Sequence, residues 1–438
     1  MKMYKKIVSF LIAGVCVVTM CSCNEKKVYE GEYNYETDCQ YSYDNSVSSW
    51  KMVQSDGEGQ YIFKNNFIYY YNMKNHTMSP VCNKANCLHD KENMESKKSE
   101  CNAYATMDVF NSMNSYIQYY EGDVYYVRAD SLYRLRKDGS KVDTIFTTED
   151  EMPIYNWLLH RGVLYYVIQP SYTTDVTITK EDGSKEKKVA TKCIAKALPL
   201  SAKMKEKNAE VIFESDEDHN VLTFDRFRAY KNYVVYNVIA NENDYKMTDE
   251  ESFFKQLSVK YYIYDTETKE NKEIPKPKEC DETVGISGIA FLKDRMLIGL
   301  YDYFKDEEYK LPIYSMNYDL TDEKVWLEDV EQGKYIHSYG DYVIISDSDI
   351  QYSVKNNQNS ANIEIYSKDA ECISNFVYPM NVMGSFNGFG PDGINVEFEE
   401  TDEKIDVYEL DFEKVKNCHG EEVQLDLVAS IENTGENQ

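Results

Sequence analysis

Gly122-Asp123-Val124-Tyr125-Tyr126-Val127 and Gly162-Val163-Leu164-Tyr165-Tyr166-Val167 are two copies of the motif that decides the fold of this chain. In each copy a glycine turn leads into a short, almost continuous run of apolar and tyrosine residues. Such a run is typical of a β-strand that is covered on both faces. Because adjacent residues of a strand point to opposite faces, one ring of each Tyr-Tyr pair can pack on each side.

The motif recurs along the chain. Five further copies lie at residues 66–71, 232–236, 294–298, 340–345 and 392–396. A second apolar strand follows most copies, at residues 132–135, 262–265, 312–316, 363–366 and 407–411. Each such pair predicts a hairpin. The copies are spaced by about 54 residues on average, and periods of about 40–50 residues with several strands per unit are typical of β-propeller blades.

These repeats predict an all-β chain that folds as a seven-bladed β-propeller over residues 59–432. Two polar insertions explain the widest spacings: residues 174–192, which we expect to form an outlying hairpin, and the acidic residues 241–257. We expect the ring to close by pairing of residues 41–53 with residues 423–428. The alternative is a large β-sandwich or two smaller β domains, because regular turn spacing alone does not separate these classes.

The first 22 residues have the features of an export signal. Residues 1–6 carry three lysines and no acid, and residues 7–20 form an apolar run that is too short to cross a bilayer as a mature helix. Ser22-Cys23 resembles the lipobox of bacterial lipoproteins, in which a small residue precedes the cysteine that receives diacylglycerol. The resemblance implies that Cys23 is the lipid attachment site. The alternatives are Cys21 as acceptor and an ordinary secretory signal.

The chain is therefore expected to have four parts. These are a lipoprotein signal peptide at residues 1–22, the lipidated cysteine and a tether at 23–58, the β-propeller at 59–432 and a disordered tail at 433–438. No other stretch approaches transmembrane length, so we expect everything after Cys23 to lie on the extracytoplasmic face of the cell membrane. That compartment permits disulfides.

The charge excludes one class of partner. Against 48 Lys and Arg the chain carries 76 Asp and Glu, which gives a formal net charge of -28. Binding to nucleic acid needs a basic surface that contacts phosphates. We therefore expect no nucleic acid partner.

Cys82, Cys87, His89 and Cys101 form an unusual cluster of residue types that can ligate a metal. Three sulfurs and one imidazole can complete a tetrahedral structural zinc site, with the thiolates deprotonated by the metal. The alternative is a loop held by disulfides. Besides Cys23, the mature chain has eight cysteines, and an even number permits four bridges in an oxidising compartment. Both readings stay open at this point.

Together with the repeats, this cysteine segment resembles one found in Tyr-rich β-propeller lipoproteins of Gram-positive bacteria, which are of unknown function. In those proteins three cysteines and a histidine follow the first Tyr-rich hairpin. The family is distantly similar to TolB-type propellers. The resemblance covers residues 59–432 and implies a propeller fold, without naming an activity.

Catalytic signals are weak. The sequence lacks the HExxH, P-loop, dinucleotide-binding and GxSxG patterns. Asp347 and Asp349 are candidate acid/base residues because they point to the same face of one strand. The three tryptophans are candidates for stacking on sugar rings: Trp50, Trp157 and Trp326.

The sequence thus favours a non-catalytic, membrane-anchored propeller that binds a glycan, a peptide or an envelope protein. The alternative is an exported propeller hydrolase or lyase that acts on glycan or peptide, with acids converging from different blades. A third hypothesis is a scaffold for envelope assembly. Fold alone does not separate these functions.

Overall fold

The computed structural model describes most of the region that the repeats occupy. The described residues are 34, 37–38, 51–64, 66–85, 87, 100–105, 117–168, 173–179, 184–191, 193–201, 204–215, 220–224, 227–241, 257–281, 283–302, 304–306, 308–347, 360–379, 386, 388–390, 392–401 and 403–432. They all belong to one compact unit, Tyr33–Gln438. No helix among them has the length and apolar character needed to cross a membrane.

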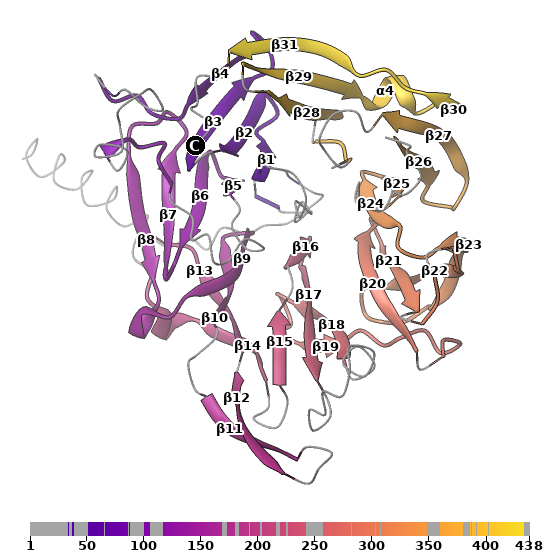
Figure 1. Ribbon diagram of the computed structural model, residues 1–438. Helices are drawn as coiled ribbons and strands as arrows, with labels where there is room; N and C mark the ends of the chain where they lie inside the picture. The colour runs from indigo at the N-terminus through magenta and orange to yellow at the C-terminus, as the bar shows by residue number, and fades with distance from the viewer. Residues whose placement is uncertain are drawn as a thin grey trace, which may run out of the picture. The chain divides into compact units, whose positions relative to one another are not determined.

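Seven sheets follow one another along the chain and form the blades of a β-propeller (Figure 1). The chain is therefore an all-β, seven-bladed propeller, as the repeats predicted, and the alternative of a sandwich is excluded. We number the blades in chain order. Apart from strands, the described residues contain three short helices: η3 (Glu149–Glu151), η4 (Glu206–Asn208) and α4 (Phe412–Val415).

The first four blades come from the N-terminal two thirds of the chain. Blade 1 contains β1 (Lys51–Ser55), β2 (Gly59–Lys64), β3 (Phe67–Asn72) and β4 (Thr77–Pro80). Blade 2 contains β5 (Ile117–Tyr120), β6 (Asp123–Arg128), β7 (Ser131–Arg136) and β8 (Val142–Thr147). Blade 3 contains β9 (Ile154–His160), β10 (Val163–Ile168), β13 (Ile194–Pro199) and β14 (Glu210–Glu214). Blade 4 contains β15 (Asn220–Phe224), β16 (Arg228–Tyr230), β17 (Tyr233–Asn241), β18 (Leu257–Asp265) and β19 (Asn271–Glu273).

The last three blades complete the ring. Blade 5 contains β20 (Val284–Phe291), β21 (Arg295–Asp302), β22 (Lys310–Asn317) and β23 (Lys324–Glu331). Blade 6 contains β24 (Tyr335–Tyr339), β25 (Tyr342–Ser346), β26 (Ser360–Ser367), β27 (Cys372–Pro379) and β30 (His419–Glu422). Blade 7 contains β28 (Ile394–Glu400), β29 (Lys404–Asp411) and β31 (Asp426–Glu432).

The predicted hairpin in the first insertion is confirmed. Strands β11 (Thr173–Thr179) and β12 (Lys185–Thr191) pair antiparallel between β10 and β13 of blade 3 and form a sheet of their own. Most of the second insertion, residues 242–256, lies outside the described residues.

Tight turns begin the central strand in blades 2 and 3. The two turn residues of blade 2, Glu121 and Gly122, have φ angles of 46° and 84°. Those of blade 3, Arg161 and Gly162, have φ angles of 44° and 70°. Positive φ at both central residues is the geometry of a type I′ hairpin turn, whose twist matches that of the flanking strands. The residues on either side of each turn are direct pairing partners, so the strands register without a gap.

Four of the seven motif copies, the second, third, fifth and sixth, are the second strands of blades 2, 3, 5 and 6. The fourth copy is β17, which follows β15 and β16 and pairs with both of them, and the seventh is β28, the first strand of blade 7. The first copy is displaced by one strand, because it is β3, the third strand of blade 1. The equivalent strand is β2, which is buried along its whole length but begins with Gly59-Gln60 and is therefore less apolar at its start. Blade 1 also begins with β1 at Lys51, inside the stretch assigned to the tether.

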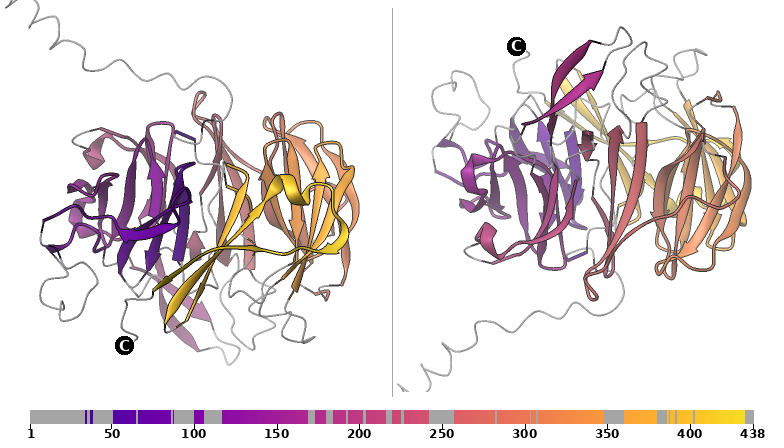
Figure 2. Two further views of the ribbon diagram at one scale, coloured as in Figure 1. Left: turned by 90° about the horizontal axis from the view of Figure 1, so that it is seen from above. Right: turned by 90° about the horizontal axis from the view of Figure 1, so that it is seen from below.

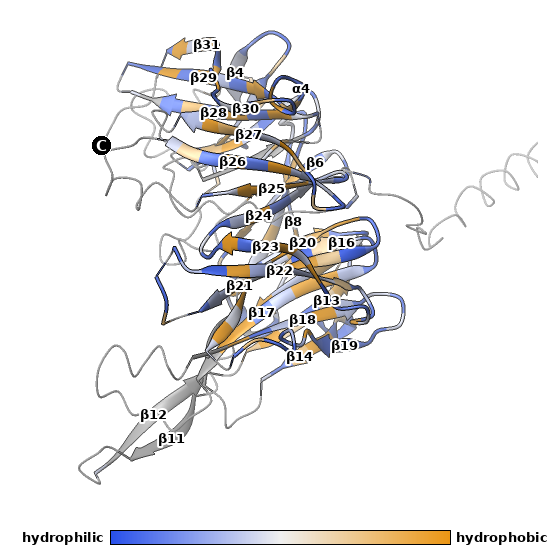
Figure 3. Cartoon of the chain, turned by 90° about the vertical axis from the view of Figure 1, so that its right-hand side faces the viewer, coloured by the Kyte–Doolittle hydropathy of each residue, from blue (hydrophilic) through white to orange (hydrophobic). Residues whose placement is uncertain are grey.

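The Tyr-Tyr pairs pack on both neighbours, as expected from strand geometry. Tyr125 joins the apolar cluster between blades 2 and 3, whereas Tyr126 joins the one between blades 1 and 2. Tyr165 and Tyr166 divide in the same way between blade 4 and blade 2. Among the described residues there is one such cluster at each of the seven blade interfaces. Figure 3 shows hydrophobic residues recurring along the strands of the blades.

The ring closes in a different way from the one expected. Strand β1 pairs with β2 of its own blade, and β31 pairs with β29, so the predicted pairing with residues 423–428 is wrong for residues 51–53. The rest of the predicted segment, residues 41–50, lies outside the described residues. Side-chain packing joins blades 1 and 7 instead. The ring of Tyr71 meets that of Phe398 edge-on at 5.7 Å between centroids. Apolar contact alone can join blades 1 and 7, because the faces of the blades are already apolar.

The C-terminal segment ties blade 6 to blade 7. After β29 the chain forms α4, adds β30 in parallel to β27 of blade 6, and returns to blade 7 as β31. Figure 2 shows this segment lying across the outer strands of the two blades. Asp411 caps α4 by accepting a hydrogen bond from the backbone amide of Glu413 at 2.8 Å.

Candidate metal centre

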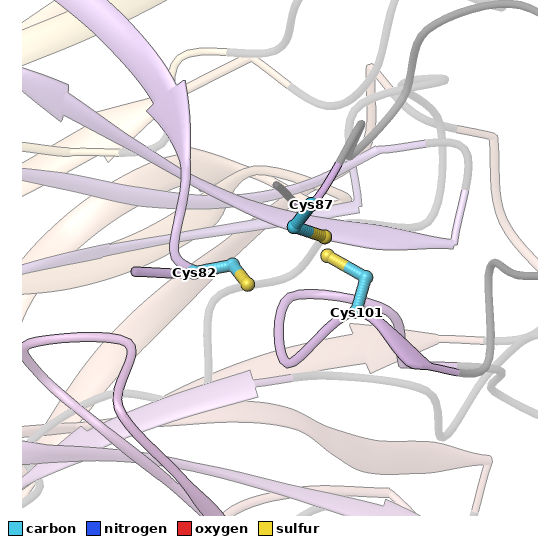
Figure 4. Close-up of side chains that lie close together, drawn as sticks. All are labelled: Cys82, Cys87 and Cys101. Carbon is cyan, nitrogen blue, oxygen red and sulfur yellow. The ribbon is translucent and has the colours of Figure 1, made fainter. Parts of the chain in front are cut away.

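Three cysteines converge beside blade 1. Cys82 follows β4 almost directly, Cys87 lies five residues further on, and Cys101 lies on the arm that leads back to the sheet. Their sulfur atoms all lie within 4.8 Å of one another (Figure 4). In the described part of the chain no other group of His, Cys, Asp or Glu comes together in a way that suits a metal ion.

Short backbone turns aim the three thiols at one another. The amide of Cys82 donates to the carbonyl of Pro80 at 2.8 Å, and the amide of Cys87 donates to the carbonyl of Lys84 at 3.3 Å. The carbonyl of Cys101 accepts from the amide of Tyr104 at 3.2 Å. Lys84 also reaches across the loop and donates from Nζ to the carbonyl of Glu100. The two arms of the loop are therefore fixed to each other as well as folded locally.

Strand β3 holds both arms of the loop. Val81, just before Cys82, donates its amide to the carbonyl of Ile68 at 2.9 Å. On the other arm, the carbonyl of Ala103 accepts from the amide of Ile68 at 2.8 Å. The segments that carry Cys82 and Cys101 thus meet at one residue of the sheet. The loop is anchored to a strand at both arms, which positions its side chains more accurately than a free loop would.

Blade 2 supplies a second support. The carbonyl of Gly139, in the turn between β7 and β8, accepts from the amide of Asn83 at 3.2 Å and from Nδ2 of Asn102 at 2.8 Å. One carbonyl therefore binds the residue next to Cys82 and the residue next to Cys101. Gly139 has a φ of 68°, and a side chain there would place Cβ 2.7 Å from the backbone nitrogen of Cys82. Glycine is required at this contact.

We expect Gly139→Ala to lower the free energy of unfolding by about 2–5 kcal/mol, from about 1–2 kcal/mol of left-handed strain and about 1–3 kcal/mol of overpacking. Gly122→Ala is the matched control, because Gly122 has a φ of 84° but no atom within 4 Å of the added Cβ. Gly122→Ala should lower the free energy of unfolding only by the left-handed strain, about 1–2 kcal/mol. Urea unfolding of both variants measures the difference, and equal losses would contradict a close contact between Gly139 and the cysteine loop.

The pKa values of the Cys82 and Cys101 thiols shift in opposite directions. Burial opposes ionisation of Cys82, but the backbone amides of Lys84 and Asn102 and the two other thiols donate hydrogen bonds to it, and together they lower the pKa of the Cys82 thiol. Burial raises the pKa of Cys101 to about 12. Its apolar surroundings belong to the cluster between blades 7 and 1. The cluster therefore holds a first thiolate readily, while a second negative charge needs a cation beside it.

The donor set and the spacing fit a thiophilic metal. Tetrahedral zinc with Zn–S bonds of about 2.3 Å places its ligand sulfurs about 3.8 Å apart, which is compatible with the observed convergence. A disulfide would use two of the three thiols and leave one out. Cys82 and Cys87 are free thiols. His89, the predicted fourth ligand, and Cys23, the predicted lipid site, lie outside the described residues.

The other candidate residues that the structure describes make structural contacts within and between the blades. Trp157 is fully buried in the cluster between blades 2 and 3. Trp326 packs against Tyr366 and donates from Nε1 to the carbonyl of Lys368 at 2.8 Å. Asp347 accepts from the amide of Asn362 at 2.8 Å and pairs with Lys334 at 3.3 Å. Asp349 and Trp50 lie outside the described residues.

Sequence reasoning missed a buried carboxyl group in blade 7. Glu397 on β28 is 4% exposed, and burial raises its pKa to about 8, although Tyr378 and Asn395 hydrogen-bond to it. Its Oε1 has no hydrogen-bond partner among the described residues. In the sequence of β28, the apolar residues Val396 and Phe398 flank Glu397. They face blade 1, while Glu397 points the other way, and only the structure shows that this side is also buried. A glutamate at an alternate strand position normally faces water.

Fold and site together define the class: a seven-bladed β-propeller with a cysteine cluster on its first blade. No family model and no curated protein sequence matches the chain. Among solved structures, an oligogalacturonate lyase in complex with manganese is 10% identical, covers 86% of this chain and 90% of its own, and superposes with a TM-score of 0.50. A likeness at this identity shows the fold alone.

Two further structures are similar with lower scores. An oligogalacturonate lyase from Vibrio parahaemolyticus is 12% identical over 86% of this chain and 88% of its own, with a TM-score of 0.45. An acylaminoacyl peptidase from Pyrococcus horikoshii is 10% identical over 87% of this chain and 53% of its own, with a TM-score of 0.46.

Proposed function

We propose that the chain is an extracytoplasmic lipoprotein, anchored through Cys23, whose propeller binds a glycan, peptide or envelope protein without turning it over. In this proposal Cys82, Cys87 and Cys101 hold one structural zinc ion that locks the loop between blades 1 and 2. The observation that carries the metal part is the convergence of three thiols within 4.8 Å on a loop that two blades support. The anchor and the binding role rest on the sequence.

The chemistry of the donors favours zinc over harder cations. Thiolates select zinc, copper(I) and iron–sulfur centres, whereas manganese and calcium prefer carboxylate, carbonyl and water oxygens. The manganese of the similar oligogalacturonate lyase structure is therefore no guide to the metal at this cluster. The lowered pKa of Cys82 and the hydrogen bonds to its sulfur suit a thiolate ligand. When bound, zinc would cross-link the two arms of the loop.

A locked loop suits a binding propeller. A propeller presents loops on a rigid ring, and a cross-link lowers the conformational entropy that a loop loses when it binds a partner. The proposed metal is structural, because three protein sulfurs leave one tetrahedral position, which His89 would fill. A catalytic zinc would instead keep that position for water.

We expect the mature protein, purified without chelator or reductant, to contain about one zinc per chain and no disulfide among these cysteines. Cys87→Ser should lose the zinc, because two thiolates bind far more weakly than three. Cys372→Ser is the matched control, since Cys372 is exposed and lies in blade 6. Elemental analysis and thiol counting on the same sample measure both quantities. A Cys82–Cys87 or Cys87–Cys101 disulfide without zinc would contradict the metal site, and turnover of a glycan or peptide by the same protein would contradict the non-catalytic role.

A further inference from the structure

One end of the propeller carries the tight turns of blades 2 to 5, and we call it the turn end. Its turns are residues 121–122, 161–162, 231–232 and 293–294. Hydrogen bonds join each turn to the next: Gly162 N to the Tyr120 hydroxyl at 2.5 Å, His160 Nε2 to the Lys231 carbonyl at 2.6 Å, and Lys231 Nζ to the Lys293 carbonyl at 2.9 Å. The four turns therefore form one continuous surface.

Arg161 on this surface binds a residue from the segment before the propeller. Its Nε and Nη2 donate to the two carboxylate oxygens of Asp38, both at 2.8 Å, which is the bidentate geometry of a strong ion pair. Its Nη1 donates to Oδ1 of Asn232 in the next blade at 2.9 Å. The side chains of Arg161 and Asp38 are 10% and 1% exposed. The carboxylate is thus enclosed in a site built by blades 3 and 4.

The backbone takes part as well. The amide of Arg161 donates to the carbonyl of Thr37 at 2.8 Å. The amides of Thr37 and Asp38 both donate to the carbonyl of Asn34, at 3.1 Å and 2.7 Å, and so hold these three residues together. Arg161 has the left-handed φ of the hairpin turn, 44°, and its amide bonds to the carbonyl of Thr37. Side chain and backbone of one residue therefore recognise a short acidic peptide.

We propose that Arg161 and Asn232 form a docking site for Thr37 and Asp38 of the chain's own N-terminal segment, and that this docking directs the turn end of the propeller toward the membrane. The docking stands on the contacts above. The orientation also rests on the proposed function, because it needs the lipid anchor at Cys23.

The short stretch of chain between Cys23 and Asn34 connects the docking to the orientation at the membrane. Asn34 lies eleven residues after Cys23, and eleven extended residue steps span at most roughly 40 Å. A docked segment therefore keeps the turns of blades 3 and 4 within that distance of the lipid. Strand β10 begins at the turn end and runs away from it, so the hairpin β11–β12 that follows lies at the opposite end. The opposite end is then the one presented to partners.

Amide hydrogen exchange on the full mature chain tests the docking. In Asp38→Ala we expect the Arg161 amide to exchange at least about five times faster, relative to the Leu297 amide in blade 5 as an internal reference. Arg161→Lys keeps the positive charge but cannot make the two parallel hydrogen bonds of the guanidinium to Asp38, so it should release the segment too. Asp322→Ala is the control, because it removes an exposed partner of Arg295 at 3.0 Å. A smaller acceleration in Asp38→Ala, or an equal one in the control, overturns the docking.

Epitope tags on the lipid-anchored protein test the orientation. One tag is inserted between Asp182 and Gly183, in the β11–β12 hairpin, and the other between Thr268 and Lys269, next to the blade 4 turn, where the amide of Thr266 donates to the carbonyl of Asn232 at 2.8 Å. On vesicles, antibody should reach the hairpin tag but reach the second tag only after detergent or in Asp38→Ala. Equal access to both tags overturns the orientation. Failure of the protein to partition with vesicles contradicts the lipid anchor, while the exchange result still decides the docking.

Discussion

Replacing Tyr165 with alanine should lower the free energy of unfolding by about 3–5 kcal/mol, the usual cost of removing a fully buried aromatic side chain. Tyr165 is 2% exposed and lies in the cluster between blades 3 and 4. Its ring contacts those of Phe227 and Tyr264, with centroids 6.2 Å and 6.4 Å away. The truncation removes the ring and leaves a cavity that the two rigid sheets cannot close.

Two companion variants make this prediction specific. Tyr165→Phe keeps the ring and should lower the free energy of unfolding much less, which separates the effect of ring packing from that of the hydroxyl. Tyr309→Ala removes a tyrosine that is 40% exposed, and it should cost less than about 1 kcal/mol. Urea unfolding followed by circular dichroism gives the three values. A loss for Tyr165→Ala no larger than that for Tyr309→Ala would contradict the role of the Tyr-Tyr pair as the contact between blades.

The same pairs explain why the fold could be predicted from the sequence. A strand that is buried on both faces has an unusual composition, and Tyr125-Tyr126 and Tyr165-Tyr166 show it within two adjacent residues. The prediction failed where this signal was weaker. Strand β2 is buried throughout but starts with Gly59-Gln60, so the sequence pattern points instead to the more apolar β3 as the first copy. Ring closure could not be predicted, because packing between blades 1 and 7 leaves no pairing pattern in the sequence.

The cysteine site could be predicted in part for a similar reason. Cys82, Cys87 and Cys101 are close in sequence, and their convergence needs only a folded loop. By contrast, Asp38 and Arg161 are 123 residues apart, and nothing local marks either of them as a partner. Gly139 also contacts the cysteine loop from another blade, and its role depends on a neighbour that only the closed ring supplies. Contacts between distant segments therefore account for most of what the sequence did not reveal.

Glu397 should make the propeller less stable as the pH rises from about 4.5 to about 8. Burial raises the pKa of its carboxyl to about 8 in the folded chain, against an ordinary value of 4.5. The folded state therefore keeps a proton that the unfolded state has lost in this range, and stability falls with pH where the native state binds more protons. The stabilising contribution is complete below pH 4.5 and is lost as the pH rises through 8. The full loss is on the order of 5 kcal/mol, because each unit of pKa shift corresponds to about 1.4 kcal/mol.

Glu397→Gln tests this dependence, because it keeps the shape of the side chain and removes its titration. The difference in unfolding free energy between variant and wild type, measured by urea unfolding at intervals from pH 4 to pH 9, should move steadily in favour of the variant. Tyr378→Phe removes a hydrogen bond that favours the charged carboxylate, so it should shift the loss toward higher pH, since the pKa of Glu397 would rise further. A difference that stays constant across this range would show that Glu397 is ionised in the folded chain, and hence that water or a cation reaches its Oε1 between blades 6 and 7.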